Sequence, residues 1–307
     1  MTVIAVAHAV IHLLLVLALP PLMIGVVNKT KAFFAGRAGP PLLQPYHDLA
    51  KLLGKGVVLS KTTSWIFLAG PAVGLATTFC AALLVPLGGH AAPVRFDGDF
   101  VLFAYALGLG RFFTVAAALD TGSAFEGMGG AREATFACLA EPAVFFGMLV
   151  LARSSGSYSL SVMMGQAVTA MWSTSSAALA AVLVSWFVVL LAENSRIPFD
   201  DPNTHLELTM IHEVMVLDHG GPPLAVILYG AAMKLFVFGA VLIAVALPGA
   251  GRDPWLAWAV FVGATLLLSV VVGVVESVMA RLRLPQVANI LIAAGLISAF
   301  GAVLLVR

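Results

Sequence analysis

The side chains best suited to proton or charge transfer are gathered in one segment, AENSRIPFDDPNTHLELTMIHEVMVL, which runs from Ala192 to Leu217. Carboxylates and imidazoles take up and release protons, and burial moves their pKa values toward the working range. Little else in the chain is polar, because 10% of its 307 residues are charged and 61% are hydrophobic. Soluble domains do not have this composition, but it is typical of a domain embedded in lipid. Placing charged side chains in lipid is energetically unfavourable, so we expect the charges that remain to be functional.

Eight apolar stretches are long enough to cross a bilayer, and they must position this segment. Lipid requires each stretch to satisfy its own backbone hydrogen bonds, so we expect helices. The sequence therefore predicts an all-α, polytopic integral membrane protein in which residues 1–307 form a single membrane domain. The expected spans are residues 3–27, 65–88, 100–119, 135–152, 175–192, 223–247, 255–280 and 285–306.

The distribution of lysine and arginine predicts the orientation. Ten of them fall in loops on one side of the predicted membrane, and four fall on the other. The positive-inside rule then places the long loops 28–64, 120–134, 193–221 and 281–284 in the cytoplasm. Both termini are expected on the outer side of the inner, cytoplasmic membrane. The net charge of +1 predicts no nucleic-acid partner.

Four charged residues lie within or beside the apolar spans: Arg111, Glu141, Lys234 and Glu276. Each costs about 2.5–3.5 kcal/mol at the centre of a membrane, so these side chains must pair, face a hydrated cavity or become neutral. Two acids and two bases make pairing within the protein feasible. Static ion pairs between helices and a relay for protons or charge are both compatible with this pattern.

The segment 193–221 also predicts local structure. Pro198 and Pro202 exclude helix around them, so the chain from Glu193 to Asn203 is expected to be extended and folded back. Thr204 and Glu207 have the spacing of a capping box, which predicts the start of a helix that ends near Gly220. Capping alone explains Glu207, and a carboxylate directed into a protein-lined cavity is the alternative.

On this predicted helix, Thr209, His212 and Glu213 share a polar arc. The histidines of the segment are seven residues apart and form no HExxH motif, and neither cysteine belongs to a CxxC motif. The sequence therefore predicts no metal site, iron–sulfur cluster or other cofactor in this chain. In the first long loop, Gln44, Asp48 and Lys51 recur at helical spacing. They indicate either a surface helix on the membrane or the polar rim of a cavity.

The acidic segment resembles the signature of subunit 1 of respiratory complex I, which is close to AE-x-N-R-x-P-F-D followed by a glutamate-rich turn. The matching residues are Ala192, Glu193, Arg196, Pro198, Phe199, Asp200 and Glu207. Other elements similar to that family occur in the same order: Arg37-x-Gly39-Pro40, Gly130-x-Arg132 with Glu141, and Arg283-x-x-Gln286. The resemblance covers nearly the whole chain.

Departures from that signature favour one branch of the superfamily. The run from Thr204 to Pro222 is similar to the membrane subunits of group 4 [NiFe]-hydrogenases, especially those of the formate hydrogenlyase and hydrogenase-4 type. Asp201 and His205 stand where the quinone-reducing branch usually has an apolar residue and a glutamate. The short tail that ends at Arg307 also resembles the hydrogenase branch.

The resemblance implies a non-catalytic membrane subunit of an oxidoreductase complex. Such a subunit anchors a peripheral redox arm and couples electron transfer to ion translocation. The implied partners are hydrogenase large and small subunits, which would hold the [NiFe] centre and iron–sulfur clusters, together with antiporter-like membrane subunits. The alternative is a quinone-chamber subunit of a complex I-like NADH dehydrogenase. An independent secondary transporter is a third hypothesis, although the chain shows no internal repeat that would support it.

The resemblance also implies two sets of site residues, neither of them catalytic or metal-binding. The expected coupling or ion path comprises Glu141, Glu193, Asp200, Asp201, Glu207, Glu213, Lys234 and Glu276. Docking of the peripheral arm is expected at Arg37, Gln44, Asp48, Lys51, Arg132, Arg196 and Arg283.

Overall fold

The computed structural model describes residues 3–201, 210–248 and 253–305, and these residues are almost entirely helical. Eight of their helices are long and apolar enough to cross a membrane, which confirms the predicted all-α, multi-pass fold. They are α1 (Val3–Phe34), α3 (Trp65–Leu84), α4 (Asp99–Asp120), α5 (Ala124–Ser155), α8 (Ser176–Glu193), α9 (Gly221–Ala246), α10 (Pro254–Val278) and α11 (Leu284–Leu304). In the ranges described, extended structure is limited to one bridge between Leu87 and His90.

Four shorter helices complete the described structure: α2 (Gln44–Leu53), α6 (Leu160–Met163), α7 (Gln166–Thr174) and the 3-10 helix η1 (Glu213–Val216). Helix α2 confirms the helical spacing read in the first long loop. The helices also extend beyond the predicted spans, because α1 continues to Phe34 and α5 already begins at Ala124. Most of the segment expected as a loop at 120–134 is therefore helical, and the segment 153–174 contains α6 and α7.

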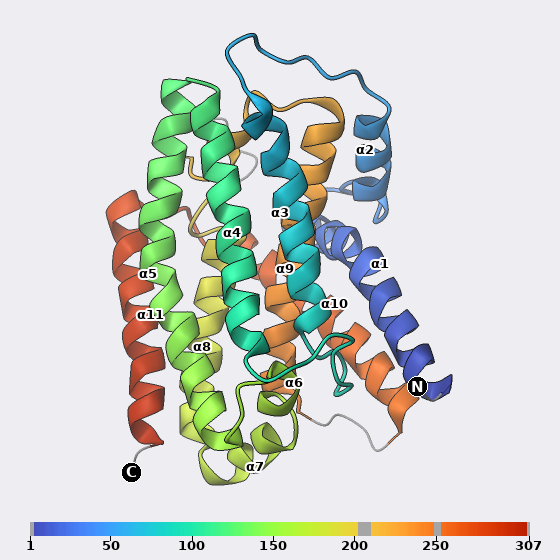
Figure 1. Cartoon of the computed structure of the whole chain (residues 1–307), viewed down its shortest axis with the longest axis vertical. Coiled ribbons are helices and arrows are strands. Elements are labelled where there is room, and N and C mark those ends of the chain that lie inside the picture. The colour runs from blue at the N-terminus through green and yellow to red at the C-terminus, as the bar shows by residue number, and fades with distance from the viewer. Residues whose placement is uncertain (1–2, 202–209, 249–252, 306–307) are drawn as a thin grey trace.

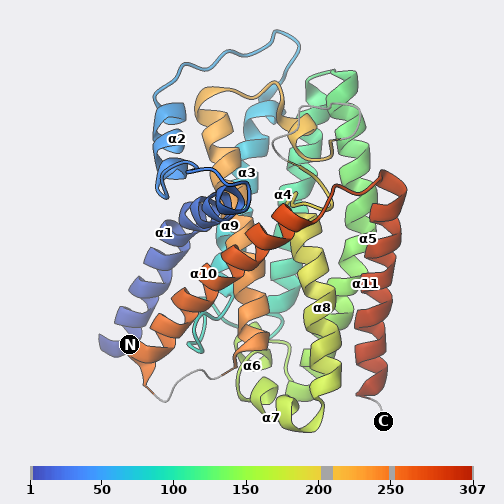
Figure 2. The same ribbon diagram turned by 180° about the vertical axis from the view of Figure 1, so that it is seen from behind.

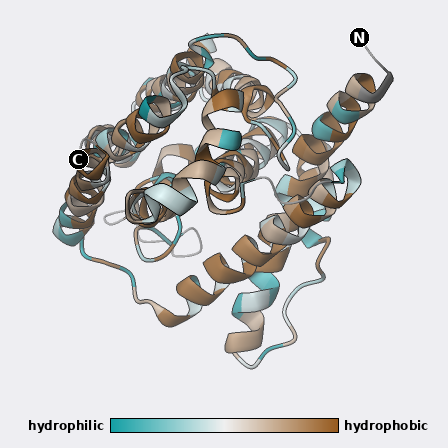
Figure 3. Ribbon diagram, turned by 90° about the horizontal axis from the view of Figure 1, so that it is seen from below, coloured by the Kyte–Doolittle hydropathy of each residue, from teal (hydrophilic) through white to brown (hydrophobic). Residues whose placement is uncertain are grey.

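Most of the long helices run along the length of the molecule, whereas α1 and α10 are strongly tilted and cross only part of it (Figures 1 and 2). The loop after α2, the α4–α5 turn and the start of α9 lie at the upper end in Figure 1. Both labelled termini, α6 and α7 lie toward the lower end, as an even number of spans requires. Viewed from below, the helices around the perimeter carry mainly apolar residues (Figure 3), which suits a surface that faces lipid.

Small residues let the helices approach closely. A Cβ atom added at Gly70 of α3 would lie 2.6 Å from the Cβ of Ala117 on α4, and one added at Gly110 would lie 2.5 Å from Oγ1 of Thr77. Close approach of this kind is the usual basis of helix association in membranes, where burial of apolar surface gives little driving force. It places the middle of α4, including Arg111, tightly against α3.

Two prolines interrupt the hydrogen bonding of α1. Pro20 and Pro21 lie inside the helix and have no N–H to donate, so carbonyl groups one turn earlier lack their usual partners. The hydroxyl of Tyr229 on α9 donates to one of these carbonyls, that of Leu17, at 2.9 Å. Tyr46 on α2 donates to the carbonyl of the next residue. Side chains of α2 and α9 therefore hold α1 at its middle.

Candidate functional site: a buried group of ion pairs

Arg111 on α4 is the centre of a group of ion pairs inside the helical bundle. Its Nη2 donates to both carboxylate oxygens of Glu193 at 2.8 Å, and its Nη1 donates to Oε1 of Glu141 at 2.7 Å. Its Nε lies 3.3 Å from Oε1 of Glu133. One guanidinium, 15% exposed, is thus shared by three carboxylates from α5 and α8. Fork-like pairing of this kind uses the planar donor geometry that arginine alone provides.

Two further side chains extend the group. Nζ of Lys234 on α9 lies 2.7 Å from Oε2 of Glu193, and Nε2 of His212 lies 3.0 Å from Oε2 of Glu133. We call these six side chains the Arg111 cluster: Arg111, Glu133, Glu141, Glu193, His212 and Lys234. The cluster joins α4, α5, α8 and α9 to the segment between α8 and α9, so it connects four membrane helices to the acidic segment.

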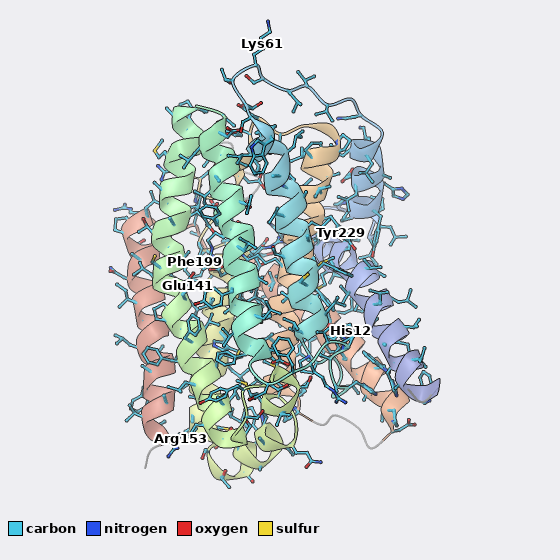
Figure 4. The ribbon with its side chains drawn as sticks, viewed as in Figure 1. His12, Lys61, Glu141, Arg153, Phe199 and Tyr229 are labelled. Atoms are coloured by element: carbon cyan, nitrogen blue, oxygen red, sulfur yellow. The ribbon has the colours of Figure 1, made fainter. Side chains whose placement is uncertain are left out.

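The carboxylates of the Arg111 cluster differ in exposure. The side chains of Glu133 and Glu193 are each 6% exposed, whereas that of Glu141 is 50% exposed. Glu141 lies about midway along α5, on the side of the bundle seen in Figure 4. A half-exposed carboxylate at mid-membrane is costly in lipid, so this position favours a polar neighbour outside the chain. The cluster therefore reaches from the buried interior to the flank of the protein.

A second group of ion pairs lies beside α1 and α10. The fully buried carboxylate of Glu276 on α10 lies 2.7 Å from Nζ of Lys31 on α1 and 3.3 Å from Nη1 of Arg196. Arg196 follows α8 directly, so this group ties the start of the acidic segment to two other helices. Lys31 lies in the last turn of α1 and Arg196 lies just after α8, and Glu276 is neutralised without lying in the Arg111 cluster.

Asp200 holds the acidic segment in its folded-back shape. Its buried carboxylate accepts the main-chain N–H groups of Ile211 at 3.0 Å and His212 at 3.1 Å, and it also accepts from Nη2 of Arg281 at 2.9 Å. The chain reverses before it through a turn that contains the cis peptide Ile197–Pro198. Asp200 thus fixes where His212 stands relative to α5.

The helix predicted after Thr204 differs from the structure. Thr204, His205 and Glu207 lie outside the described residues. Of residues 210–219, only Glu213–Val216 are helical, as the 3-10 turn η1. Asp200 accepts the N–H groups of Ile211 and His212, which an α-helix would use internally, so this tertiary contact replaces helical hydrogen bonds at these two residues. His212 and Glu213 therefore do not share the predicted helical arc.

The predicted coupling residues lie in three separate groups of ion pairs and in the acidic segment. Glu141, Glu193 and Lys234 belong to the Arg111 cluster, while Asp200 and Glu276 belong to the two neighbouring groups. Asp201 and Glu213 are half-buried on either side of the segment 202–209. Glu207 itself is outside the described residues.

The predicted docking residues divide into two kinds. Arg37, Asp48, Lys51 and Arg283 are exposed, and Gln44 donates to Asp48 within α2 at 2.8 Å. Arg132 and Arg196 make contacts within the chain: Nη1 of Arg132 donates to the carbonyl of Met210 at 2.7 Å, and Arg196 pairs with Glu276. The exposed residues remain accessible to a partner, whereas the two half-buried arginines support the acidic segment from within.

Sequence reasoning noted Arg111 as a charge in an apolar span but assigned neither it nor Glu133, His212 and Arg281 to the site, although all four make its ion pairs. One signal was present for Glu133. It follows Glu126 by seven residues among glycines and alanines, so both acids lie on one face of α5, and both are buried. Glu126 accepts the N–H of Asp218 at 3.0 Å, which ties the far end of the acidic segment to the same helix.

Similarity to known proteins extends over the whole of this architecture. A family model described as NADH dehydrogenase matches residues 6–307. The chain belongs to this family. Membership confirms the predicted place in the superfamily of complex I subunit 1.

Two relatives match most of the chain. Formate hydrogenlyase subunit 4 of Escherichia coli is 29% identical over 91% of this chain and 92% of its own length. Hydrogenase-4 component C of Escherichia coli is 30% identical over 92% of this chain and 89% of its own. A third relative, a subunit of the NADH-quinone oxidoreductase of Anaplasma phagocytophilum, is 27% identical over 72% of this chain and 70% of its own. The chain is thus more extensively similar to the two hydrogenase-named proteins than to this third relative.

The fold is also found in a solved structure. A chain of the membrane-bound sulfane sulfur reductase, described as an archaeal respiratory membrane complex, superposes with a TM-score of 0.82. The match covers 97% of this chain and 98% of that one at 21% identity, so it shows the fold. Among the described residues, no three or more histidine, cysteine, aspartate or glutamate side chains are grouped so that they could hold a metal ion.

Proposed function

We propose that this chain is a non-catalytic membrane subunit of a hydrogenase-type complex, in which it anchors the peripheral redox arm and couples electron transfer to ion translocation. The observation that carries the proposal is the Arg111 cluster, which links the acidic segment to the flank of the bundle through buried titratable groups. The hydrogenase names of two relatives support the type of complex.

The coupling follows from shared ion pairs. Electron transfer in the peripheral arm changes the charge near the segment that Asp200 holds, and Asp200 positions His212 against Glu133. Arg111 is shared by three carboxylates, so protonation of one releases donors that the other two can take. A change at the Glu133 side of the cluster is thereby transmitted to Glu141 without moving a helix. In a low-dielectric interior such charge shifts carry several kcal/mol, which is enough to bias protonation.

We assign the other subunits of the complex to the two ends and the flank of the helical bundle. The docking surface for the arm is formed by exposed basic residues: Lys61 at the upper end (Figure 4), Lys51 on α2, and Arg37 in the loop between α1 and α2. The upper end is cytoplasmic. Both termini then lie on the outer side of the inner membrane. The half-exposed Glu141 faces an antiporter-like membrane subunit. Hydrogenase large and small subunits hold the [NiFe] centre and the iron–sulfur clusters.

The experiment that tests this function is purification of the intact complex through an affinity tag on this chain. A large subunit with nickel ligands and a small iron–sulfur subunit should co-purify, and deletion of the chain should leave both in the soluble fraction. Recovery of a lone, transport-active protein would contradict the proposal.

Similarity to the NADH-quinone oxidoreductase of Anaplasma phagocytophilum favours the alternative, a quinone-chamber subunit of a complex I-like NADH dehydrogenase. Co-purification with NADH-oxidising subunits, together with inhibition of electron transfer by quinone analogues, would support that alternative instead.

A further inference from the structure

His212 lies at the junction between two parts of the site. Its main-chain N–H donates to Asp200 at 3.1 Å, and its Nε2 lies 3.0 Å from Oε2 of Glu133 on α5. Asp200 is in turn paired with Arg281, between α10 and α11. His212 is therefore attached through its backbone to the acidic segment and through its side chain to the Arg111 cluster. Among the described residues, no other imidazole makes an ion pair with a carboxylate.

The charges of the Arg111 cluster do not balance without His212. Three carboxylates, those of Glu133, Glu141 and Glu193, meet only two lysine or arginine side chains, Arg111 and Lys234. An unbalanced charge in a membrane interior is costly, so the cluster favours one additional proton. Within the part of the chain that the structure describes, the titratable group in contact with the cluster that can supply a positive charge is the His212 imidazole.

The surroundings of the imidazole suit proton exchange. A quarter of the side chain is exposed (25%), but both ring nitrogens are buried. Among the described residues neither nitrogen makes a hydrogen bond, although Nε2 forms an ion pair with Oε2 of Glu133 at 3.0 Å. A cavity of about 20 Å³ is lined by Glu133, Glu193 and His212 together with apolar residues such as Phe136 and Phe199. A space of this size has room for one water molecule. The ring thus has one nitrogen beside a carboxylate and a second one that can exchange its proton with water.

We propose that His212 relays protons between the acidic segment and the Arg111 cluster, an inference that rests on the proposed coupling function. The resting ring is an imidazolium, and its Nε2 proton passes to the Glu133 carboxylate. The neutral ring is left with its proton on Nδ1, changes tautomer by exchange with water, and then takes up a proton at Nδ1 from a hydronium ion. One proton enters, one leaves, and no electrons are transferred. The two ring nitrogens make this possible where a carboxylate or amide would only hold the proton.

The groups that face His212 determine its pH range. Glu133 faces it from α5, Lys234 from α9 and Asp200 from its own segment. Burial is the largest single influence and lowers the pKa of His212. The charge and close approach of Glu133, together with the charge of Asp200, outweigh it, so the pKa is raised above its ordinary value. The relay therefore operates with a protonated ring near neutral pH, and it loses its proton as the pH rises further.

The test uses membrane vesicles that contain the whole complex, with His212→Gln and His212→Ala compared against His219→Gln. His219 is a matched control, because it is a buried histidine of the same segment that stacks on Phe67 and contacts no member of the cluster. Electron transfer and proton translocation are measured together from pH 6 to pH 9. We expect both His212 variants to lower proton translocation by about 10²-fold, the lower range for a positioned proton-transfer group, while electron transfer continues.

Two readouts distinguish a relay from a structural role. Wild-type translocation per electron should decline at alkaline pH, whereas the His212→Gln profile should be flat. Added imidazole should restore translocation to His212→Ala but should leave His212→Gln unchanged, because the glutamine fills the space. Unchanged translocation in His212→Gln, or a loss that imidazole does not rescue and that is independent of pH, would overturn the relay.

Glu193→Gln separates this inference from the proposed function. Loss of coupling in Glu193→Gln with normal coupling in His212→Gln would overturn the relay and leave the coupling function standing. Normal coupling in both variants would overturn both.

Discussion

Replacing Glu141 by glutamine should abolish ion translocation while leaving the complex assembled, and replacing Glu193 by glutamine should damage both. The difference follows from burial and partners. Half of the Glu141 side chain is exposed, and it has one cationic partner, Arg111, at 2.7 Å. Glu193 is 6% exposed and binds both Arg111 and Lys234. Glutamine keeps the shape of glutamate and one accepting oxygen, but it removes the titration and replaces the second oxygen by an NH2 group that cannot accept.

The magnitudes can be worked out pair by pair. An exposed ion pair contributes about 0–1 kcal/mol. In the Glu141→Gln variant, Arg111 keeps its two other carboxylate partners, so the free energy of unfolding should change by less than about 1 kcal/mol. Removing one partner of a buried pair costs about 3–5 kcal/mol, and Glu193→Gln leaves Lys234 without the carboxylate that it contacts. Glu141→Gln should therefore yield the complex at close to the wild-type level, and Glu193→Gln should yield clearly less.

Three measurements check this prediction: the amount of purified complex, its thermal unfolding in detergent, and the pH gradient formed in inverted vesicles per electron transferred. In Glu141→Gln, proton transport should fall by about 10²-fold at nearly normal electron transfer, as expected for loss of a proton-transfer group. Unchanged transport per electron would refute the coupling role of Glu141. Loss of the complex with intact coupling in the remainder would show that the ion pair with Arg111 is static.

Three further outcomes are expected. After both native cysteines are replaced, single cysteines introduced at Lys55 and Asp97, which are exposed toward opposite ends of the bundle, should label from opposite sides of the membrane, and labelling from one side would contradict the topology. Arg37→Glu should release the peripheral subunits from membranes, because like-charge contacts at an interface cost several kcal/mol. The control Arg153→Glu, at the other end of the bundle, should leave the peripheral subunits bound. If both variants retain these subunits, docking at Arg37 is contradicted. The melting temperature of the complex should fall as the pH rises through the raised pKa of His212. The stability that the pairing with Glu133 contributes is fully present below the pKa of histidine in the unfolded chain, near 6.5. It is lost as the pH rises above the pKa of His212 in the folded protein. That part of the pH dependence should be absent in His212→Gln, and an identical melting profile in this variant would contradict the assignment.

The sequence was sufficient for the helices and for part of the site. Apolar length predicts each span, because lipid leaves helices as the way to satisfy the backbone, and the charges of Arg111 and Glu141 are conspicuous inside such spans. Their actual partners depend on how helices far apart in the chain face each other. Glu193 and Lys234 meet through the packing of α8 against α9, which hydropathy does not encode.

The acidic segment was the least predictable element. Its capping pattern predicts a helix, but Asp200 binds the N–H groups of Ile211 and His212 and prevents one there. Local propensity is a weak guide where a buried carboxylate supplies stronger partners. The role of His212 follows from this tertiary contact and not from its spacing relative to the other histidines.

The short connection between α4 and α5 has a consequence for membrane insertion. Only residues 121–123 separate the two helices, and Arg111 of the first pairs with Glu141 of the second. Each of these charges alone would oppose partition from the translocon into lipid by about 2.5–3.5 kcal/mol. Entering together as a helical hairpin, they neutralise each other before α8 and α9 have been synthesised. Insertion as a hairpin would thus lower the cost of placing both charges in lipid, and Glu193, which contacts both Arg111 and Lys234, would join the pair afterwards.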